Sequence, residues 1–277
     1  MSVINTNVSA LNAQSALTVN SRNMGVVMQQ LSTGSRINSA KDDAAGLAIS
    51  QNMTSQIRGL DQAVRNANDG ISLLQTADGA LVETSNMLQR MRELSVQSAN
   101  GTLSDVQRGY LNTEFTNLSD QIGQIASDTV WNGKAILAGT AGDASTSTAF
   151  TFQTGQSSTT TIAATITAMT VSGLVLSAAA VGTQANAVTA LGIVDTALAS
   201  VNSQRATIGA VTNRLTYAAD NMANISTNIS ASRSRIMDTD YAQATSQLAK
   251  TQIIQQAATA MLAQANQQPQ SVLALLK

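Results

Sequence analysis

The chain has 277 residues and contains neither Cys nor His, which excludes thiol nucleophiles, Ser-His catalytic arrangements and the imidazole and thiolate ligands of common zinc sites. Its 15 Lys and Arg residues nearly balance its 16 Asp and Glu residues, so the charge offers no basic surface for nucleic acid or for an anionic membrane. Aromatic residues make up only 3% of the chain, a composition that favours narrow seams between helices. We therefore expect no catalytic residue, no cofactor and no bound metal.

The first periodic stretch predicts a helix that ends at Thr33-Gly34, where a glycine follows the last apolar residue of the pattern. Its apolar residues recur every seven positions, with two more on the same side, which is a heptad seam: Ala10, Ala13, Leu17, Met24, Val27 and Leu31. A short polar connection, residues 36–43, follows and carries two acids just ahead of the next helical pattern.

A much longer helix is predicted from Ala44 to about Ala99. Its apolar residues step by three and four, and later by seven: Met53, Ile57, Leu60, Val64, Ala67, Ile71, Leu74, Leu81 and Leu88. At 1.5 Å per residue this helix is roughly 80 Å long, which predicts a rod. After a turn at Asn100-Gly101, Ser104-Asp105 can cap a third helix with apolar residues Leu111, Phe115, Leu118, Ile122 and Ile125.

The middle of the chain has a different composition, rich in Thr, Ser, Ala and Gly. Between Gly139 and Ala190 the only charged residue is Asp143. Phe150 and Phe152 alternate with polar positions, and residues 162–168 alternate in the same way, which favours short strands or hairpins. A flexible Ser/Thr-rich insert is the alternative interpretation.

Helical periodicity resumes near Leu191 and continues to about Ile236, and a last helical stretch precedes the single proline, Pro269. We thus expect a mainly α fold: an antiparallel coiled-coil or helical-bundle rod, with paired N- and C-terminal helices and a small middle segment containing a β-hairpin. The predicted boundaries are 1–43, 44–137, 138–185, 186–236 and 237–277. No stretch has the length of uninterrupted apolar sequence that a membrane span needs, and the first residues do not form the pattern of a cleaved secretory signal.

The two terminal segments each carry an apolar stripe with little bulk, and isolated helices of this kind are marginal in water. They need partners, which can be each other and copies from neighbouring subunits, since a head-to-tail contact that does not close builds a filament. Ordinary packing within one bundle is the alternative. The residues predicted at a filament-core interface are Ala10, Leu17, Met24, Val27, Leu31, Leu248, Ile254, Ala258, Met261, Ala265, Leu273 and Leu276.

Motifs at both ends of the chain resemble those of bacterial flagellins, in the right order. The matching segments cover about residues 1–137 and 190–277, and the motifs are 1–10, 31–49, 88–100, 234–242, 252–257, 261–267 and 269–273. Within them, the linker signature comprises Arg36, Asn38, Asp42 and Asp43. The middle segment is short compared with that of larger flagellins.

The resemblance implies a structural subunit that self-assembles into the bacterial flagellar filament and serves swimming motility as a helical propeller. It further implies export through the flagellar type III apparatus to an extracellular position. The implied partners are other flagellin copies, the flagellar cap and junction proteins, and an export chaperone on the C-terminal segment. A hook–filament junction protein is the nearest alternative, and a chemoreceptor-type hairpin would need a membrane span or an attached sensor.

Some flagellins are also bound by the innate immune receptor Toll-like receptor 5. The positions of this sequence that match the family's receptor patch are Gln89, Arg90, Leu94 and Glu114. The two charged residues suit charge-assisted contacts and the leucine suits an apolar anchor. The alternatives are a solvated helix face and an axial contact between subunits.

Overall fold

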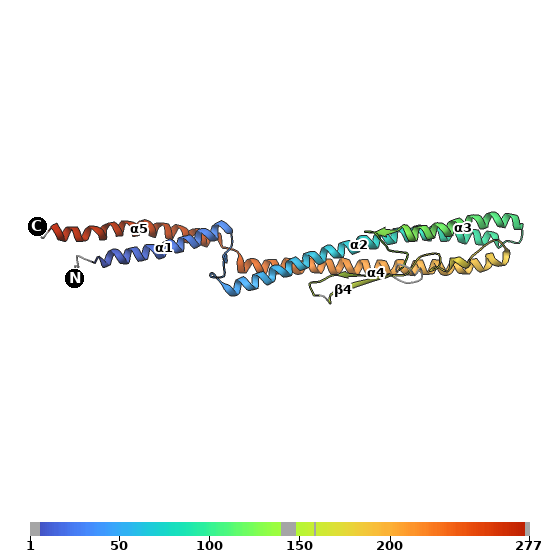
Figure 1. The fold of residues 1–277 in the computed structure, drawn as a ribbon, viewed down its shortest axis with the longest axis horizontal. Coiled ribbons are helices and arrows are strands. Elements are labelled where there is room, and N and C mark those ends of the chain that lie inside the picture. Colours follow the sequence, from blue (N-terminus) through green and yellow to red (C-terminus); the bar gives the residue numbers. More distant parts are fainter. Residues whose placement is uncertain (1–5, 140–147, 158, 275–277) are drawn as a thin grey trace. The chain divides into compact units, whose positions relative to one another are not determined.

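The structure is a computed structural model that describes residues 6–139, 148–157 and 159–274. In this part of the chain it contains five long α-helices and two small antiparallel hairpins (Figure 1). The helices are α1 (Val8–Thr33), α2 (Ala44–Ser98), α3 (Asp105–Asp128), α4 (Gln184–Met237) and α5 (Tyr241–Ala274). The strands are β1 (Val130–Trp131), β2 (Lys134–Ala135), β3 (Thr148–Gln153) and β4 (Thr161–Ile166), and a short 3-10 helix, η1, spans Leu176–Ala178. The mainly α prediction is confirmed.

The chain forms two compact units. The first combines both ends, up to Ile57 and from Thr227 onward, and the second comprises Arg58–Ser226. The long helices α2 and α4 each contribute residues to both units. The finer division into five segments stays a prediction.

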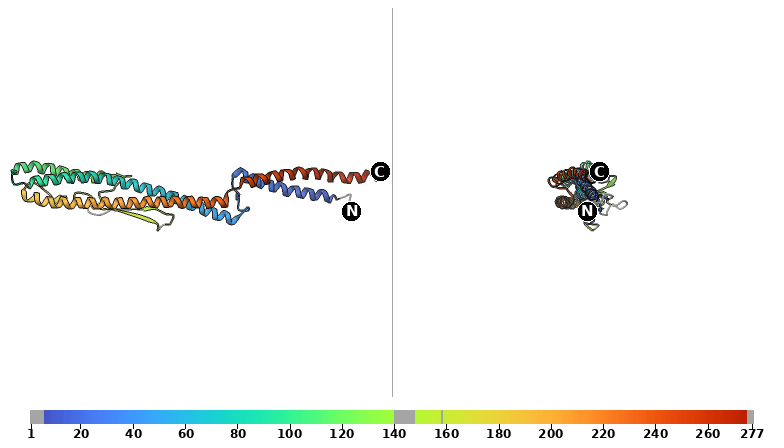
Figure 2. Two further views of the ribbon diagram at one scale, coloured as in Figure 1. Left: turned by 180° about the vertical axis from the view of Figure 1, so that it is seen from behind. Right: turned by 90° about the vertical axis from the view of Figure 1, so that its left-hand side faces the viewer.

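In the first unit, α1 and α5 run antiparallel and lie side by side, as both views of the ribbon show (Figure 2). Residues at steps of three and four turn toward the partner helix and are buried or half-buried. On α1 they are Ala10, Ala13, Leu17, Asn20, Met24, Val27 and Leu31, and on α5 they are Ala244, Leu248, Thr251, Gln255, Ala258, Leu262 and Ala265. The predicted heptad seam of α1 is therefore confirmed, and alanine fills much of it, so the pair buries little apolar area per turn.

Helix α1 begins and ends as its sequence predicts. The side chain of Asn7 accepts a hydrogen bond from the amide of Ala10 at 3.1 Å, and Gly34 ends the helix in the left-handed conformation with φ 70. Glycine is favoured at this position because it adopts positive φ without steric cost.

The second unit packs α2, α3 and α4 around a seam of buried residues at steps of three and four. On α4 these are Ala187, Ala190, Val194, Ala197, Val201, Gln204, Ile208, Val211, Leu215 and Met222. On the first turns of α2 in this unit they are Leu60, Ala63, Ala67, Gly70, Leu74 and Ala77. Val64 and Ile71, which belong to the predicted apolar stripe of α2, are half-buried at its edge, because the small residues beside them, Ala63 and Gly70, take the fully buried positions.

The hairpin of β3 and β4 explains why a glycine, Gly70, occupies one of the buried seam positions of α2. The two strands pair in register from Thr148↔Ile166 to Gln153↔Thr161. A Cβ added to Gly70 would lie 2.9 Å from Cδ1 of Phe152, so the aromatic ring rests against the bare backbone of α2. The predicted strands are confirmed, and the flexible insert is not needed for the residues that the structure describes.

A second, shorter hairpin pairs β1 with β2. Its two-residue turn is Asn132-Gly133, and both residues have positive φ, 49 and 76 respectively. This is the backbone that Asn-Gly favours in tight hairpins. Asn-Gly is a strong sequence signal for such a hairpin, although the predicted elements did not include one here.

Candidate assembly site

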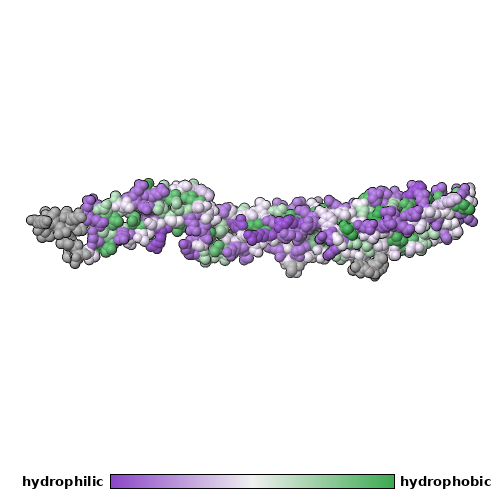
Figure 3. Space-filling view, turned by 45° about the horizontal axis from the view of Figure 1, so that its top comes forward, coloured by the Kyte–Doolittle hydropathy of each residue, from purple (hydrophilic) through white to green (hydrophobic). Residues whose placement is uncertain are grey.

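The helix pair of the first unit leaves large apolar side chains in contact with solvent. The most exposed are Ile253 at 66%, Met261 at 65% and Leu11 at 57%. The others are Val8, Val19, Val26, Met28 and Ile254. In Figure 3, hydrophobic side chains show on the surface of α1 and α5 among hydrophilic ones. An exposed apolar set on a small unit commonly marks a surface that contacts another molecule.

The structure divides the predicted interface residues into two groups. Those in the seam of α1 against α5 are already buried or half-buried within the chain: Ala10, Leu17, Met24, Val27, Leu31, Leu248, Ala258 and Ala265. Ile254 and Met261 are exposed instead, at 41% and 65%. Both lie at the exposed edge of the stripe that they share with Ala258 and Ala265, since residues three positions apart are offset by only about 60° around the helix axis.

Two predicted interface residues lack a structural description. The side chain of Leu273 and all of Leu276 lie outside the described residues. Leu11 and Ile253, by contrast, are exposed apolar residues that the sequence analysis missed. In the sequence, each of these two residues is recognisable as an apolar residue at a heptad position that does not belong to the seam.

Asparagine side chains cross the seam at two levels. The amide of Asn20, only 7% exposed, donates to the main-chain carbonyl of Thr251 at 2.8 Å. The amide of Asn7 donates to the carbonyl of Ala265 at 2.7 Å. The seven-residue spacing of Ala13, Asn20 and Val27 indicates a polar residue within the seam, although the predicted seam included apolar residues only.

The linker signature joins the chain segments that enter and leave the helix pair. Ser35 and Asp238 form an antiparallel bridge, in which the amide of Arg36 donates to the carbonyl of Met237 at 2.6 Å. The guanidinium of Arg36 also donates to the carbonyl of Ile236, from Nη2 at 2.8 Å and from Nε at 3.3 Å. Arg36 thereby satisfies main-chain acceptors at the C-terminus of α4, which lack partners within the helix.

The remaining linker residues shape the start of α2. Oδ2 of Asp42 accepts from the amides of Asn38 and Ser39 and from the hydroxyl of Ser39, at 3.1, 2.9 and 2.9 Å. The hydroxyl contact contributes most to lowering the pKa of Asp42, although the carboxyl is exposed. Asp43 accepts from the amide of Gly46 at 2.8 Å and so caps α2.

The predicted receptor patch is only partly on the surface. Gln89 is exposed, and Arg90 lies between two carboxylates: Nη1 is 2.9 Å from Glu93 and Nη2 is 2.9 Å from Glu114. These hydrogen bonds, first that of Glu114, raise the pKa of Arg90. Leu94 is 0% exposed. Its prediction as an apolar anchor on the surface is wrong.

The burial of Leu94 follows from the packing of α2 on two sides. Arg90 reaches Glu114 on α3, while Arg92 pairs with Asp195 on α4 at 2.7 Å. Both neighbouring helices thus cover this part of α2. One-sided periodicity cannot reveal a helix with two covered faces.

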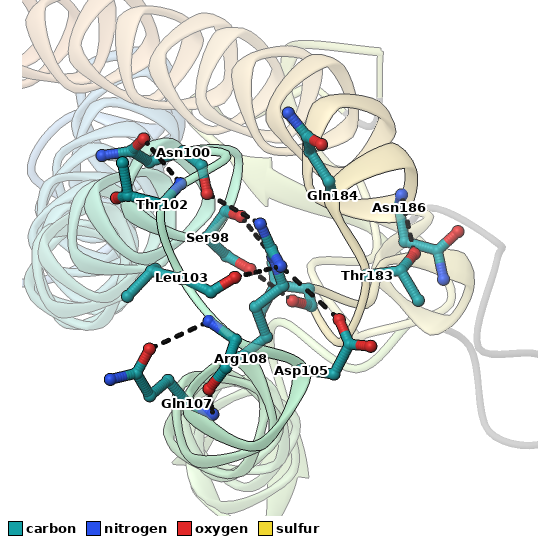
Figure 4. A network of polar contacts seen from close by, with 12 residues as sticks. Ser98, Asn100, Thr102, Leu103, Asp105, Gln107, Arg108, Thr183, Gln184 and Asn186 are labelled. Atoms are coloured by element: carbon teal, nitrogen blue, oxygen red, sulfur yellow. Dashed lines mark hydrogen bonds and ion pairs between the residues drawn. The ribbon is translucent and has the colours of Figure 1, made fainter.

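A buried arginine organises the turn between α2 and α3 (Figure 4). The guanidinium of Arg108 donates to the carbonyls of Ser98 at 2.9 Å, Leu103 at 2.8 Å and Asn100 at 2.7 Å. The side chain is only 6% exposed. The cap at Ser104 was predictable from the sequence, but this arginine was not, because nothing in its spacing distinguishes it from a surface residue.

Within the described ranges, no group of three or more acidic side chains is placed to hold a metal ion. Nor does any described helix have the length and apolar character to cross a membrane. The chemistry that these surfaces offer is association through exposed apolar side chains. The fold and the site together define a class of helical proteins whose two chain ends pair and present an apolar surface for assembly.

Comparisons with known proteins identify that class more closely. The family model for the bacterial flagellin N-terminal helical region matches residues 4–142, and that for the C-terminal helical region matches residues 191–276. Over 277 residues the chain is 43% identical to a flagellin from Halalkalibacterium halodurans, covering 99% of this chain and 100% of that protein. It is 36% identical to flagellin A of Vibrio cholerae over 384 aligned positions, covering 99% of each.

Solved structures agree with this relationship. The crystal structure of Bacillus cereus flagellin matches with a TM-score of 0.50 and 34% identity, covering 57% of this chain and 88% of that one. A putative flagellar hook-associated protein from Vibrio parahaemolyticus matches with a TM-score of 0.61 at 18% identity, covering 71% of this chain and 100% of that one. The second likeness shows the fold alone, so the junction-protein alternative is not favoured.

The chain belongs to the bacterial flagellin family. It is a structural subunit that self-assembles into the flagellar filament, an extracellular appendage for motility, and it is not an enzyme.

Proposed function

We propose that the subunit polymerises through the outward sides of α1 and α5, and that the seam between these helices holds the pair together within each copy. The observation that carries this proposal is the set of large apolar side chains left exposed on both helices, foremost Leu11, Ile253 and Met261. A pair whose seam is rich in alanine gains little from its own packing. Contacts with a second copy bury this apolar surface and complete the core.

This proposal assigns separate roles to the predicted interface residues. Ile254 and Met261 contact neighbouring copies, while the seam residues hold α1 against α5. The second unit has a core of its own, in which large side chains such as Phe115, Leu81 and Leu215 are fully buried. The five-segment division, with filament-core segments at 1–43 and 237–277, is part of the same proposal.

The test replaces exposed apolar residues without touching the seam. Ile253→Gln combined with Ile254→Gln should raise the critical concentration for polymerisation at least tenfold, since each change removes apolar area from the interface. Val188→Gln, at a residue of the second unit that is 59% exposed, is the matched control and should polymerise normally. Critical concentrations come from sedimentation, and unchanged polymerisation of the double variant would refute the interface assignment.

The marginal stability of the α1–α5 pair also bears on how the subunit is exported and which proteins assist its assembly. We expect export of an unfolded or partly folded chain through the flagellar type III apparatus, a chaperone on the C-terminal segment, and flagellar cap and junction proteins at the filament ends. A marginal α1–α5 pair supports this, because segments that become ordered on association remain available to a channel and a chaperone. Isothermal titration of the export chaperone against the full chain and against a chain without Gln252–Lys277 tests the chaperone site. Equal binding by both would contradict it.

For Toll-like receptor 5, the exposed residues Gln89, Arg90 and Glu114 support a contact surface without Leu94. The ion pairs of Arg90 hold its guanidinium in place, which suits either a receptor contact or an axial contact between subunits. A receptor reporter assay with monomeric Arg90→Ala separates the two. A reduced response supports the receptor contact, whereas an unchanged response removes Arg90 from it.

A further inference from the structure

The sequence contains two Asn-Gly pairs, Asn100-Gly101 and Asn132-Gly133, and all four residues are exposed on the second unit. Asparagine is a thermolabile residue, and it is most labile before glycine. The main-chain nitrogen of the glycine can attack the side-chain amide carbon of the asparagine, and glycine has no side chain to shield this nitrogen. Because the attack requires the main chain of the turn to rotate, the structure around each pair determines how fast it reacts.

The first pair is held in place by the buried arginine of the α2–α3 turn. The carbonyl of Asn100 accepts a hydrogen bond from Nη2 of Arg108 at 2.7 Å, and its side-chain oxygen accepts from the amide of Thr102 at 3.2 Å. The same guanidinium binds the carbonyls of Ser98 and Leu103. Rotation of the main chain at Asn100 would break hydrogen bonds to a buried charged group, which is costly. The fold therefore protects Asn100 from the reaction.

The second pair forms the turn between β1 and β2 and has no such support. Among the described residues, none makes a hydrogen bond with the side chain of Asn132, and a Cβ added to Gly133 would meet nothing within 4 Å. The two strands that flank the turn share two residue pairs. A hairpin of this length is marginally stable, so the turn opens locally at low cost.

We propose that Asn132 is a deamidation site through which the second unit changes with age, without an enzyme. The main-chain nitrogen of Gly133 bonds to the side-chain amide carbon of Asn132, and a succinimide ring forms. The side-chain amide group takes up the amide proton of the glycine and leaves as ammonia. Water then opens the ring at one of its two carbonyls, which gives aspartate or isoaspartate.

The two products change the hairpin differently. Aspartate adds one negative charge but fits the turn, since it tolerates positive φ as asparagine does. Isoaspartate leads the main chain through the former side chain and adds one methylene, which shifts β2 against β1. The shift reaches the core, because Ile136 and Leu137 follow β2 directly and are 0% exposed. The hydrogen bond from the amide of Ile136 to the carbonyl of Thr129, 3.1 Å long, should weaken first.

The experiment incubates the full-length chain in mildly alkaline buffer, both folded and unfolded in urea. Peptide mass spectrometry measures deamidation at each asparagine, and an isoaspartate methyltransferase with a labelled methyl donor measures isoaspartate. In the folded chain, Asn132 should deamidate about tenfold faster than Asn100, equivalent to about 1.4 kcal/mol in the barrier. In urea the two should react at similar rates, because only the fold protects Asn100.

Three variants separate the contributions. Asn132→Gly accepts positive φ, and after incubation it should contain little isoaspartate and keep the Ile136 amide protected from hydrogen exchange. Asn100→Gly is the matched control and should accumulate isoaspartate as the natural chain does. Arg108→Lys should raise deamidation at Asn100 without changing it at Asn132, because an ammonium group lacks the planar fork that holds three carbonyls.

Three results would overturn the inference: deamidation of Asn100 at least as fast as that of Asn132 in the folded chain, the same difference between them in urea, or undiminished isoaspartate in Asn132→Gly. Unchanged exchange of the Ile136 amide in chains that carry isoaspartate at position 132 would refute the effect on the hairpin. None of these measurements depends on the proposed polymerisation surface.

Discussion

The side-chain amide of Asn20 donates a hydrogen bond to the main-chain carbonyl of Thr251 within the seam that joins α1 to α5. These two residues are 231 positions apart in the sequence. Thr251 is itself 3% exposed, and its hydroxyl bonds to carbonyls of its own helix. A polar layer thus lies in the middle of a seam that holds the two chain ends together.

Replacing Asn20 tests how this layer affects the helix pair. Asn20→Leu should stabilise the pair by about 1 kcal/mol, because an apolar seam residue packs better than asparagine at such a position. Asn20→Ala should destabilise it by about 1 kcal/mol through loss of the hydrogen bond and of volume. Amide hydrogen exchange of α1 in the filament measures both effects, and equal protection in the two variants would contradict the prediction.

Two glycines of α2 should respond in opposite directions to alanine. Gly70→Ala should lower the free energy of unfolding by about 1–2 kcal/mol, because the new Cβ collides with the ring of Phe152. Gly79→Ala is the matched control: nothing lies within 4 Å of its added Cβ, so the helix gains about 1 kcal/mol. Thermal unfolding followed by circular dichroism gives both values. Stabilisation by both substitutions would show that Phe152 does not pack as described.

Arg108→Ala should destabilise the second unit by about 2–4 kcal/mol, since three carbonyls lose a charged donor in a buried turn. Arg108→Lys should recover only part of this loss, because an ammonium group lacks the planar fork that reaches three acceptors. Urea denaturation of the full chain measures the difference. A lysine variant as stable as the natural chain would assign the effect to charge alone.

Protonation of the Asp42 carboxylate should make the linker less stable in acid. Its pKa is lowered in the folded chain, so its contribution is fully present above the unfolded value of about 3.9 and disappears as the pH falls through the lower folded value. The natural chain should therefore be more stable than Asp42→Asn at pH 7, and the two should converge in acid. Unfolding free energies across this range check it, and a difference that does not change with pH would contradict the role of Asp42.

The helices were largely predictable because their signals are local. Gly34 and Ser104 mark helix ends through backbone and capping chemistry that acts within a few residues. The seam of α1 was also predictable, since Leu17, Met24 and Leu31 repeat at the period of the helix. These features depend little on which segment packs against which.

The errors occur where packing depends on distant parts of the chain. Gly70 replaces a large residue in the seam because Phe152 comes from a hairpin some eighty residues later. Leu94 was expected on the surface from its match to the family's receptor patch, whereas two helices cover this part of α2. Ile254 and Met261 lie at the exposed edge of a stripe in which Ala258 and Ala265 face α1, and apolar character alone does not separate a seam from an assembly surface.

Seeded growth followed by electron microscopy shows whether the paired chain ends form the surface through which the subunit polymerises. Fragments of natural filaments are mixed with purified full-length monomer, or with a monomer that lacks Gln252–Lys277. The full chain should extend the fragments, while the truncated chain should stay soluble with its second unit folded and extend none. Normal filaments from the truncated chain, or no growth of the full chain under any condition, would contradict it.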